Sequence, residues 1–402
     1  MARSRGRAAG TGPSDEFVKP IKLVHIVGAR PQFIKLAPVS RAIARRGGGL
    51  QELIVHTGQH YDPLLSQIFF EELQIPPPVA NLAVGSGSHA RQTAAMLEGI
   101  EAFLRDAEPA AVVVYGDTNT TLAGALAASK LMLPLVHVEA GLRSHNREMP
   151  EELNRVLADH ASDLLLAPTS AAMENLRLEG LEPRSRWVGD VMYDAVLETL
   201  ARGGKRSQPL ERLNLVPGQF GLATVHRAES TRPENLARAL RLLNRIAEAV
   251  VPLVFPVHPR TRDAIQAHLP DWKAVPELTV TEPLGSLETL MMAQAAALVA
   301  TDSGGLQKEA FMLGCPCVTL RTETEWLETL EGEANVLVGL DAEAALRAAR
   351  RARDLDARRR EGIAMQARTT YGEGHAASRC VEAILDLLAQ RARSPAMLGS
   401  VR

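Results

Sequence analysis

Short runs of apolar and β-branched residues recur along this chain, separated by longer stretches with helical periodicity. The first half contains KLVHIVG (22–28), ELIVHTG (52–58), AVVVYGD (111–117), LVHVEAG (135–141) and DLLLAP (163–168). The second half contains FGLATVH (220–226), PLVFPVH (252–258), ALVATDSGG (297–305) and PCVTLR (316–321). A strand covered by helices on both faces is apolar throughout, so these runs predict parallel sheets in an α/β fold. One of the intervening helices is expected at residues 92–104.

The length of the chain is sufficient for two domains. With 402 residues, 46% of them hydrophobic, each half can bury a core of its own. The segment ARGGKRSQPLERLNLVPG (201–218) is rich in charge, glycine and proline, which is typical of a linker. We therefore expect two similar α/β domains, at residues 21–200 and 219–374, with a cleft between them. Residues 1–20 lack the apolar core of a signal peptide and are expected to form a disordered tail.

Charge and cysteine content exclude several classes of partner. The formal net charge is -2, from 45 basic and 47 acidic residues, so no basic field is present for a nucleic acid or an anionic membrane. No apolar stretch approaches the roughly 18 residues of a membrane span.

The three cysteines, Cys315, Cys317 and Cys380, suit a reducing cytoplasm. Cys315 and Cys317 have no second pair nearby, which favours core packing over a metal site. We expect a small-molecule partner.

Polar residues follow nearly every predicted strand, in both halves of the chain. They are Arg30, Gln59 with His60, Asp117, Glu139, His226, His258, and Asp302 with Ser303. Open parallel sheets bind ligands outside the carboxyl ends of their strands, so these residues predict two facing rims around one cleft. Ordinary helix capping accounts for part of the set.

Two motifs have the features of phosphate-binding turns. In GARPQFIKLAP (28–38), Arg30 and Lys35 lie near an expected helix start, although a solvated basic turn would have the same composition. In TDSGGLQKEA (301–310), Ser303, Gly304 and Gly305 enter a helix directly, so backbone N–H groups can converge on an anion. Glu309 either accepts hydrogen bonds from ribose hydroxyls or is a surface glutamate.

Histidines and carboxylates provide the candidate acid–base groups. His226 and His258 each precede an arginine or Pro-Arg after a second-half strand, which suits a diphosphate. Asp117 is either a functional carboxylate or the N-cap of a helix, and Glu139 lies at the next strand end. In REMPEELNR (147–155), a proline at the first helical position is followed by Glu151 and Glu152, which also complement the helix dipole. These two glutamates cannot point the same way.

The motifs GARPQFIK, YGDTNTT, HVEAGLR with MPEELNR, VHRAE, TDSGGLQKEA and VTLRTETEW occur in this order between about residues 21 and 374. In this combination the sequence resembles the non-hydrolysing UDP-N-acetylglucosamine 2-epimerases. The resemblance implies two Rossmann-like domains facing a central cleft, the GT-B type, with a C-terminal helix within residues 375–402 returning to the first domain. It further implies interconversion of UDP-GlcNAc and UDP-ManNAc without a cofactor or metal. A cytoplasmic homodimer that supplies surface polysaccharide precursors is the corresponding biological expectation.

The chemistry of this family explains the carboxylates. The C2 hydrogen of the sugar is barely acidic, and the family route is elimination of UDP to 2-acetamidoglucal followed by re-addition, which needs acid–base groups on both faces of the ring. By position, the catalytic residues would be Asp117, Glu139, Glu151 and His226. The UDP-binding residues would be Arg30, Lys35, His258, Ser303, Gly304, Gly305, Glu309 and Arg321. Which carboxylate serves which face stays open. Arg143, Arg147 and Arg155 are expected to orient Glu139 and Glu151, with Glu148 and Glu152 at the surface.

Two departures from the family pattern bear on the substrate and on regulation. Well-known members read Thr-Glu-Arg-Pro-Glu where this chain has TEWLE (324–328), so Trp326 replaces a cation. This variant, with GARPQF, also resembles relatives that epimerise UDP-2,3-diacetamido-2,3-dideoxy glucuronic acid. In the loop TGQHYD (57–62), Gln59 is kept but Asp62 replaces a second glutamine of allosterically activated members. A hydrolysing epimerase, a glycosyltransferase and a non-catalytic nucleotide-sugar sensor are the competing hypotheses.

Overall fold

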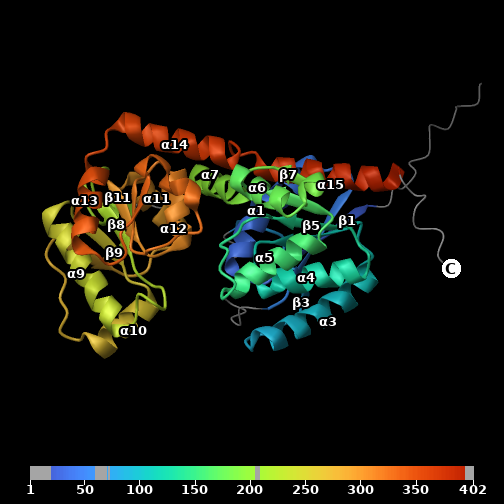
Figure 1. Ribbon diagram of the computed structural model, residues 1–402, viewed down its shortest axis with the longest axis horizontal. Helices are drawn as coiled ribbons and strands as arrows, with labels where there is room; N and C mark the ends of the chain where they lie inside the picture. Colours follow the sequence, from blue (N-terminus) through green and yellow to red (C-terminus); the bar gives the residue numbers. More distant parts are fainter. Residues whose placement is uncertain (1–19, 59–69, 71–72, 204–208, 394–402) are drawn as a thin grey trace, which may run out of the picture.

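The computed structural model describes residues 20–58, 70, 73–203 and 209–393. They form two α/β lobes, each built around one parallel sheet (Figure 1). The first sheet has seven strands in the order β3-β2-β1-β4-β5-β6-β7. Its strands are β1 (Ile21–Val27), β2 (Leu50–His56), β3 (Ala80–Asn81), β4 (Ala111–Tyr115), β5 (Leu135–Val138), β6 (Leu164–Ala167) and β7 (Ser185–Trp187). The accompanying helices are α1 (Arg30–Arg46), α3 (His89–Ala107), α4 (Asn119–Lys130), α5 (Pro150–Ala161), α6 (Ser170–Leu178) and α7 (Val191–Gly203), with the short helix η1 (Glu182–Arg184).

The second sheet has six strands in the order β10-β9-β8-β11-β12-β13. They are β8 (Gly221–Thr224), β9 (Leu253–Pro256), β10 (Leu278–Thr281), β11 (Leu298–Thr301), β12 (Cys317–Thr319) and β13 (Asn335–Leu337). The helices are α8 (Pro209–Arg212), α9 (Pro233–Ala249), α10 (Pro259–His268), α11 (Ser286–Ala295), α12 (Gly304–Met312) and α13 (Ala342–Arg353), with the short helix η2 (Leu327–Glu333). All pairings in both sheets are parallel, which confirms the predicted α/β class.

Every predicted strand forms, and the predicted helix at residues 92–104 lies within α3. The strands that sequence analysis missed are β3, β7, β10 and β13, and each of them is at the edge of its sheet. The predicted core packing of Cys315 and Cys317 is confirmed, because both are buried, and Cys380 is buried as well. Each therefore acts as a small apolar side chain.

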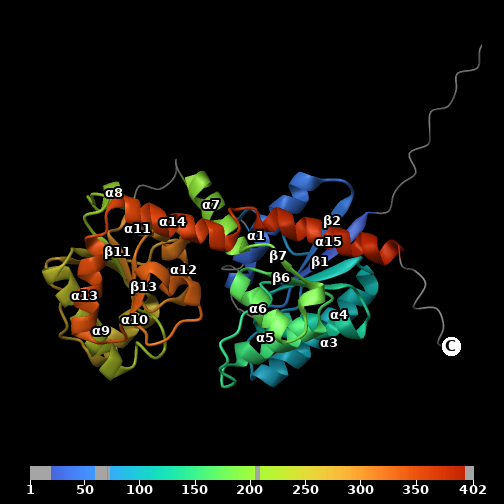
Figure 2. The same ribbon diagram turned by 45° about the horizontal axis from the view of Figure 1, so that its top comes forward.

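The last two helices run along the same side of the molecule in both views (Figures 1 and 2). Helix α14 (Ala357–Tyr371) packs on α12 of the second lobe, and α15 (Ala376–Arg393) packs on α1 and α7 of the first. The carboxylate of Asp194 in α7 accepts the backbone N–H groups of Ala376 and Ala377 at 3.2 and 2.8 Å, which satisfies the first turn of α15. The domain boundaries proposed from the sequence stay predictions, and residues 204–208 of the proposed linker lie outside the described ranges.

Two chain segments meet where the first lobe ends and α14 gives way to α15. The backbone N–H of Asp190 donates to the carbonyl of Tyr371 at 2.9 Å. Gly189 has φ +89°, and a Cβ at this position would lie 2.4 Å from the Tyr371 carbonyl oxygen and 2.9 Å from Cα of Gly372. This close approach of two backbones therefore requires glycine at residue 189.

We expect Gly189→Ala to destabilise the protein by about 2–5 kcal/mol, from the left-handed backbone and the steric clash together. Gly180→Ala is the matched control, since Gly180 has φ +75° but no atom within 4 Å of the added Cβ. Gly180→Ala should lower the free energy of unfolding only by the cost of the left-handed backbone, about 1–2 kcal/mol. Thermal unfolding of both variants measures the difference, and equal melting temperatures would contradict the packing argument.

Candidate active site

A cavity of about 570 Å³ lies between the lobes, at the carboxyl ends of strands from both sheets. Most of the site residues predicted from the sequence line it together: Arg30, Lys35, Asp117, Glu139, His226, His258, Ser303, Gly305 and Glu309. Glu151, Gly304 and Arg321 are not among the lining residues. The predicted meeting of two polar rims is therefore found in the structure.

The turn between β1 and α1 is held in place by Gln32. The side-chain oxygen of Gln32 accepts the backbone N–H groups of Gly28 and Ala29 at 2.8 and 3.1 Å. The side-chain nitrogen of Gln32 donates to the carbonyl of Tyr115 at 3.0 Å, at the end of β4. Because these partners are buried, the amide couples the positions of Arg30 and Lys35 to the neighbouring strand end.

Glu139 lies in the left-handed region, with φ +71°, directly after β5. Its carboxylate oxygen Oε1 is 2.5 Å from Nζ of Lys35, and both side chains are almost fully buried. Gly116 makes room for this pair, since a Cβ there would lie 3.0 Å from Nζ of Lys35. A non-glycine residue with positive φ costs of order 1–3 kcal/mol, and such residues cluster at functional sites. The backbone thus holds Glu139 at a fixed place on the cavity wall.

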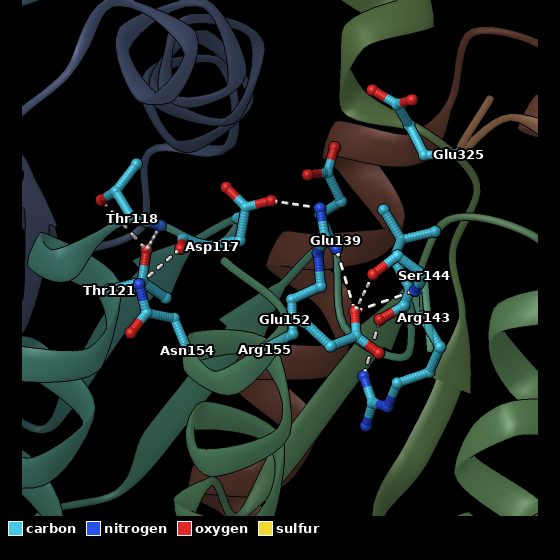
Figure 3. Close-up of polar contacts among 12 residues, drawn as sticks. Asp117, Thr118, Thr121, Glu139, Arg143, Ser144, Glu152, Asn154, Arg155 and Glu325 are labelled. Carbon is cyan, nitrogen blue, oxygen red and sulfur yellow. Dashed lines mark hydrogen bonds and ion pairs between the residues drawn. The ribbon is translucent and has the colours of Figure 1, made fainter. Parts of the chain in front are cut away.

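Asp117 is not the N-cap of the following helix. The N-cap of α4 is Thr118, whose backbone N–H donates to the side chain of Thr121 at 3.1 Å. The carboxylate of Asp117 points instead toward Arg155, with Oδ2 2.5 Å from Nη2 (Figure 3). The side-chain amide of Asn154 donates to the carbonyl of Asp117 at 2.9 Å. Helix α5 therefore orients Asp117 through Arg155, whereas the sequence predicted that Arg155 orients Glu139 and Glu151.

The surface position expected for Glu152 is wrong. Its side chain is buried and accepts hydrogen bonds from the backbone N–H groups of Ser144 and His145 and from the Ser144 hydroxyl, at 2.8–2.9 Å (Figure 3). These bonds and Arg155 hold the pKa of Glu152 below its ordinary value, although burial opposes this. The loop before α5 folds back over the helix start, which a count of charges along the sequence does not reveal. Glu151 is half-buried and lies outside the cavity.

Arg143 does not orient a carboxylate of the cavity. Its guanidinium pairs with Asp159 at 2.8 Å and Glu179 at 2.7 Å, which corrects the prediction for this residue. Asp159 is fully buried and also contacts Nδ1 of His137 at 2.7 Å, while Nε2 of His137 is 2.7 Å from the carbonyl of Gly116. This buried network supports the turn that precedes Asp117.

In the second lobe, Asp302 holds the segment that carries His226. The buried carboxylate of Asp302 accepts the backbone N–H groups of His226 and Arg227 at 2.9 Å and lies 3.5 Å from Nδ1 of His226. His258 packs 5.4 Å from His226, measured between ring centroids. Burial and the neighbouring His226 and Arg260 lower the pKa of His258, so its imidazole is neutral at pH 7.

The N-terminus of α12 faces the cavity, as the sequence predicted. Ser303 is the N-cap, and its hydroxyl accepts the backbone N–H of Leu306 at 3.3 Å. Gly304 is packed against Glu325, since a Cβ there would lie 2.6 Å from the Glu325 carboxylate. Gly305 remains exposed at the cavity wall, where backbone N–H groups and the helix dipole favour an anion.

Several cavity residues were not predicted as part of the site. Glu325 lies across the cavity from the first-lobe carboxylates (Figure 3) and is paired with Arg321 at 3.0 Å. Although burial opposes it, Arg321 holds the pKa of Glu325 below its ordinary value. Arg321 therefore acts on the site indirectly, through its ion pair with Glu325. Arg155, which was expected to orient carboxylates, and Trp326, which takes the place of a cation of the family pattern, also line the cavity.

The arrangement can bind an anionic ligand and exchange protons with it. The second-lobe rim offers imidazoles and a helix N-terminus, and the first-lobe rim offers carboxylates that are each held by a cation.

Within the described ranges, no group of three or more histidine, cysteine, aspartate or glutamate side chains is placed to hold a metal ion. No helix described here has the length and apolar character needed to cross a bilayer. Gln59, His60 and Asp62 lie outside the described residues.

The fold and the cavity define a two-lobed α/β protein with a site for an anionic ligand, and comparison with known proteins identifies the family. The family profile described as UDP-N-acetylglucosamine 2-epimerase matches residues 41–385. A UDP-N-acetylglucosamine 2-epimerase homolog of Methanococcus maripaludis is 50% identical over 327 residues, which cover 80% of this chain and 90% of that protein. The UDP-2,3-diacetamido-2,3-dideoxy-D-glucuronate 2-epimerase of Pseudomonas aeruginosa is 45% identical over 382 residues, or 91% of this chain and 100% of that protein.

A solved structure shows the same arrangement of lobes. The crystal structure of the Methanocaldococcus jannaschii UDP-GlcNAc 2-epimerase in complex with UDP-GlcNAc and UDP has a TM-score of 0.77 and 40% identity, covering 91% of this chain and 99% of that one. The chain belongs to the UDP-N-acetylglucosamine 2-epimerase family. It is therefore an isomerase with the GT-B type of fold, as the sequence predicted.

Glu309 gives the site a measurable pH dependence of stability. Burial raises the pKa of Glu309 from 4.5 to about 7, so its stabilising contribution is complete below pH 4.5 and is lost as the pH rises through 7. We expect Glu309→Gln to gain roughly 1–2 kcal/mol of stability over the wild type between pH 5 and pH 8. Thermal unfolding at both pH values measures this gain, and a constant difference between the two proteins would contradict it.

Proposed function

We propose that this protein is a non-hydrolysing UDP-N-acetylglucosamine 2-epimerase that interconverts UDP-GlcNAc and UDP-ManNAc. The observation that carries the proposal is the single cavity in which Asp117 and Glu139 of one lobe face His226 and the N-terminus of α12 of the other. Membership of the family and the ligands named for the M. jannaschii structure support the choice of substrate. A cytoplasmic homodimer that supplies surface polysaccharide precursors belongs to the same proposal, on the strength of the family resemblance.

The proposed reaction is an elimination followed by an addition. A base removes the C2 proton, the C2–H electrons form the C1–C2 double bond, and the C1–O bond breaks to release UDP. UDP then adds back to C1 of the 2-acetamidoglucal while an acid protonates C2 from the other face. Atoms and charge balance without a metal or redox cofactor, because UDP is both the leaving group and the nucleophile. The protein must hold UDP and the glucal together and keep water away from C1.

We assign acid–base roles to Asp117, Glu139 and His226, which line the cavity. Asp117 and Glu139 each have a cationic partner within 2.5 Å that fixes the carboxylate in space. Glu151 belongs to the proposal by its position in the family pattern. It lies one turn before Arg155 on α5 and outside the cavity wall.

We assign UDP to the second lobe and the adjoining start of α1. The N-terminus of α12, with Ser303, Gly304 and Gly305, suits the diphosphate, and His258 lies at the same rim. Arg30 and Lys35 add positive charge from the first lobe, and Glu309 is placed to accept ribose hydroxyls. Arg321 contributes through Glu325.

An alternative substrate is UDP-2,3-diacetamido-2,3-dideoxy glucuronic acid. The P. aeruginosa relative named for this activity aligns over its whole length with this chain. Trp326 at the cavity wall, where well-known members have an arginine, also favours this alternative. A uronate carboxylate would need a cationic partner, and Arg30, Lys35 and Arg155 are the candidates on the first-lobe side.

Incubation with UDP-GlcNAc in D2O, followed by NMR of the recovered sugar nucleotide, tests the proposal. We expect deuterium at C2 together with formation of UDP-ManNAc, and the same test on the diacetamido uronate distinguishes the alternative. No C2 deuterium with either sugar would refute the epimerase assignment. Accumulation of free N-acetylmannosamine would identify a hydrolysing enzyme. UDP binding without turnover would identify a nucleotide-sugar sensor. Transfer of the sugar to an acceptor, with the C2 protons unchanged, would identify a glycosyltransferase.

Glu139→Gln and Asp117→Asn should each lower kcat by about 100-fold or more, because each removes a proton-transfer group. UDP should still bind to both variants, as measured by calorimetry, since the α12 N-terminus is unchanged. Glu148→Gln is the matched control, because Glu148 is exposed on the adjoining loop. Unchanged kcat in either variant would remove that residue from the mechanism, and Glu151→Gln tests the third carboxylate in the same way.

A further inference from the structure

Lys308 is a buried lysine that has no place in the roles assigned so far. It lies in the second turn of α12 and its side chain has no solvent exposure. Its ammonium forms an ion pair with Asp190, and Nζ is 4.0 Å from Oε2 of Glu139. Although burial disfavours its charge, Asp190 and Glu139 hold the pKa of Lys308 above its ordinary value. The side chain is therefore cationic inside the protein.

The contacts of Lys308 connect the two lobes. Lys308 belongs to the second lobe, whereas Asp190 and Glu139 belong to the first. Asp190 is itself fixed: its Oδ1 accepts the backbone N–H of Met192 at 2.7 Å, and its own N–H donates to the carbonyl of Tyr371. The ion pair thus lies beside the close approach of Gly189 to Gly372.

Aromatic rings complete the surroundings of the ammonium. Nζ of Lys308 lies 3.9 Å from the ring centroid of Trp326 and 5.4 Å from that of Tyr371. A ring face attracts a cation without supplying a hydrogen-bond acceptor. The rings therefore stabilise the charge of the ammonium without competing with the carboxylates as hydrogen-bond acceptors.

Glu139 consequently lies between two ammonium groups. Lys35 of the first lobe contacts Oε1, and Lys308 of the second lobe approaches Oε2. No hydrogen bond to Oε2 occurs among the described residues. Lys308 is thus the cation that faces the second oxygen of the carboxylate.

The same helix carries the predicted diphosphate site. Ser303, Gly304 and Gly305 form the start of α12, and Lys308 follows one turn later on its buried side. A rigid helix of this length keeps the distance between the two groups constant. The position of the leaving group is thereby linked to the position of the carboxylate.

We propose that Lys308 is a positioning residue for the epimerisation, which holds the Glu139 carboxylate in register with the UDP-binding end of α12. The role rests on the proposed function, because Glu139 must be a reacting group. Lys308 does not line the cavity and is not a catalytic residue itself. The simpler explanation is that Lys308 only neutralises Asp190 and stabilises the fold.

The double variant Lys308→Met/Asp190→Asn separates these explanations. Lys308→Met alone leaves the buried Asp190 charge without its partner, so we expect a lower melting temperature as well as lower turnover. The double variant removes both charges, and its melting temperature should return toward that of the wild type. If Lys308 positions Glu139, kcat stays about 100-fold low, because a misplacement of about 1 Å costs that much. KM and the Kd for UDP should change less than about threefold.

A second variant and a control make the test independent of the double variant. Lys308→Gln keeps a donor for Asp190 but lacks the charge, and it should show the same loss of kcat at unchanged KM. Lys273→Met is the matched control, since Lys273 is exposed on the same lobe. Recovery of kcat to within about threefold of the wild type in the double variant or in Lys308→Gln would overturn the proposal. A rise in KM and in the UDP Kd that matches the loss of kcat would also overturn it.

The D2O exchange assay on the wild type distinguishes failure of this inference from failure of the proposed function. Wild-type protein without C2 exchange on either UDP-GlcNAc or the diacetamido uronate would remove the epimerase assignment, and the role of Lys308 with it. Exchange by the wild type together with full activity of the double variant would remove only the role of Lys308.

Discussion

The cavity depends on one property of parallel sheets, which is that all strands of a sheet end at the same edge. In each lobe this edge brings side chains that are far apart in the sequence to one rim, and the two rims share a single cavity. The first lobe contributes carboxylates, and the second contributes imidazoles and a helix N-terminus. This separation suits a reaction in which a proton leaves one side of a sugar while a diphosphate leaves the other.

Buried charges in this site are acceptable because each is placed against an opposite charge. Glu139 adopts a strained backbone conformation and is held by Lys35, and Asp117 is held by Arg155. An isolated charge in such a place would be neutralised, so these pairs determine which carboxylates can act. Trp326, which stands where the family pattern has an arginine, lines the cavity, and the buried ammonium of Lys308 lies 3.9 Å from its ring centroid.

The central strands were predictable because both of their faces are buried, and continuous apolar runs follow from that. The missed strands β3, β7, β10 and β13 are short and pair on one side only, so their sequences carry no such run. The strand-end residues were predictable because each of them directly follows one of these apolar runs. Contacts that depend on loop paths were not, and Glu152, Arg143 and the capping of α4 by Thr118 show this. Lys308 was missed because a lysine on an apolar-looking helix has no local sign of its partners.

The position of α15 has a consequence for the synthesis of the protein. The core of the first lobe contains Leu23, Phe33 and Leu36 from the start of the chain and Cys380, Val381 and Ile384 from its end. A nascent chain that has emerged only as far as the end of α14 therefore exposes an apolar groove on α1 and α7. The first lobe is the first to be translated, yet its core is completed only when α15 has been made.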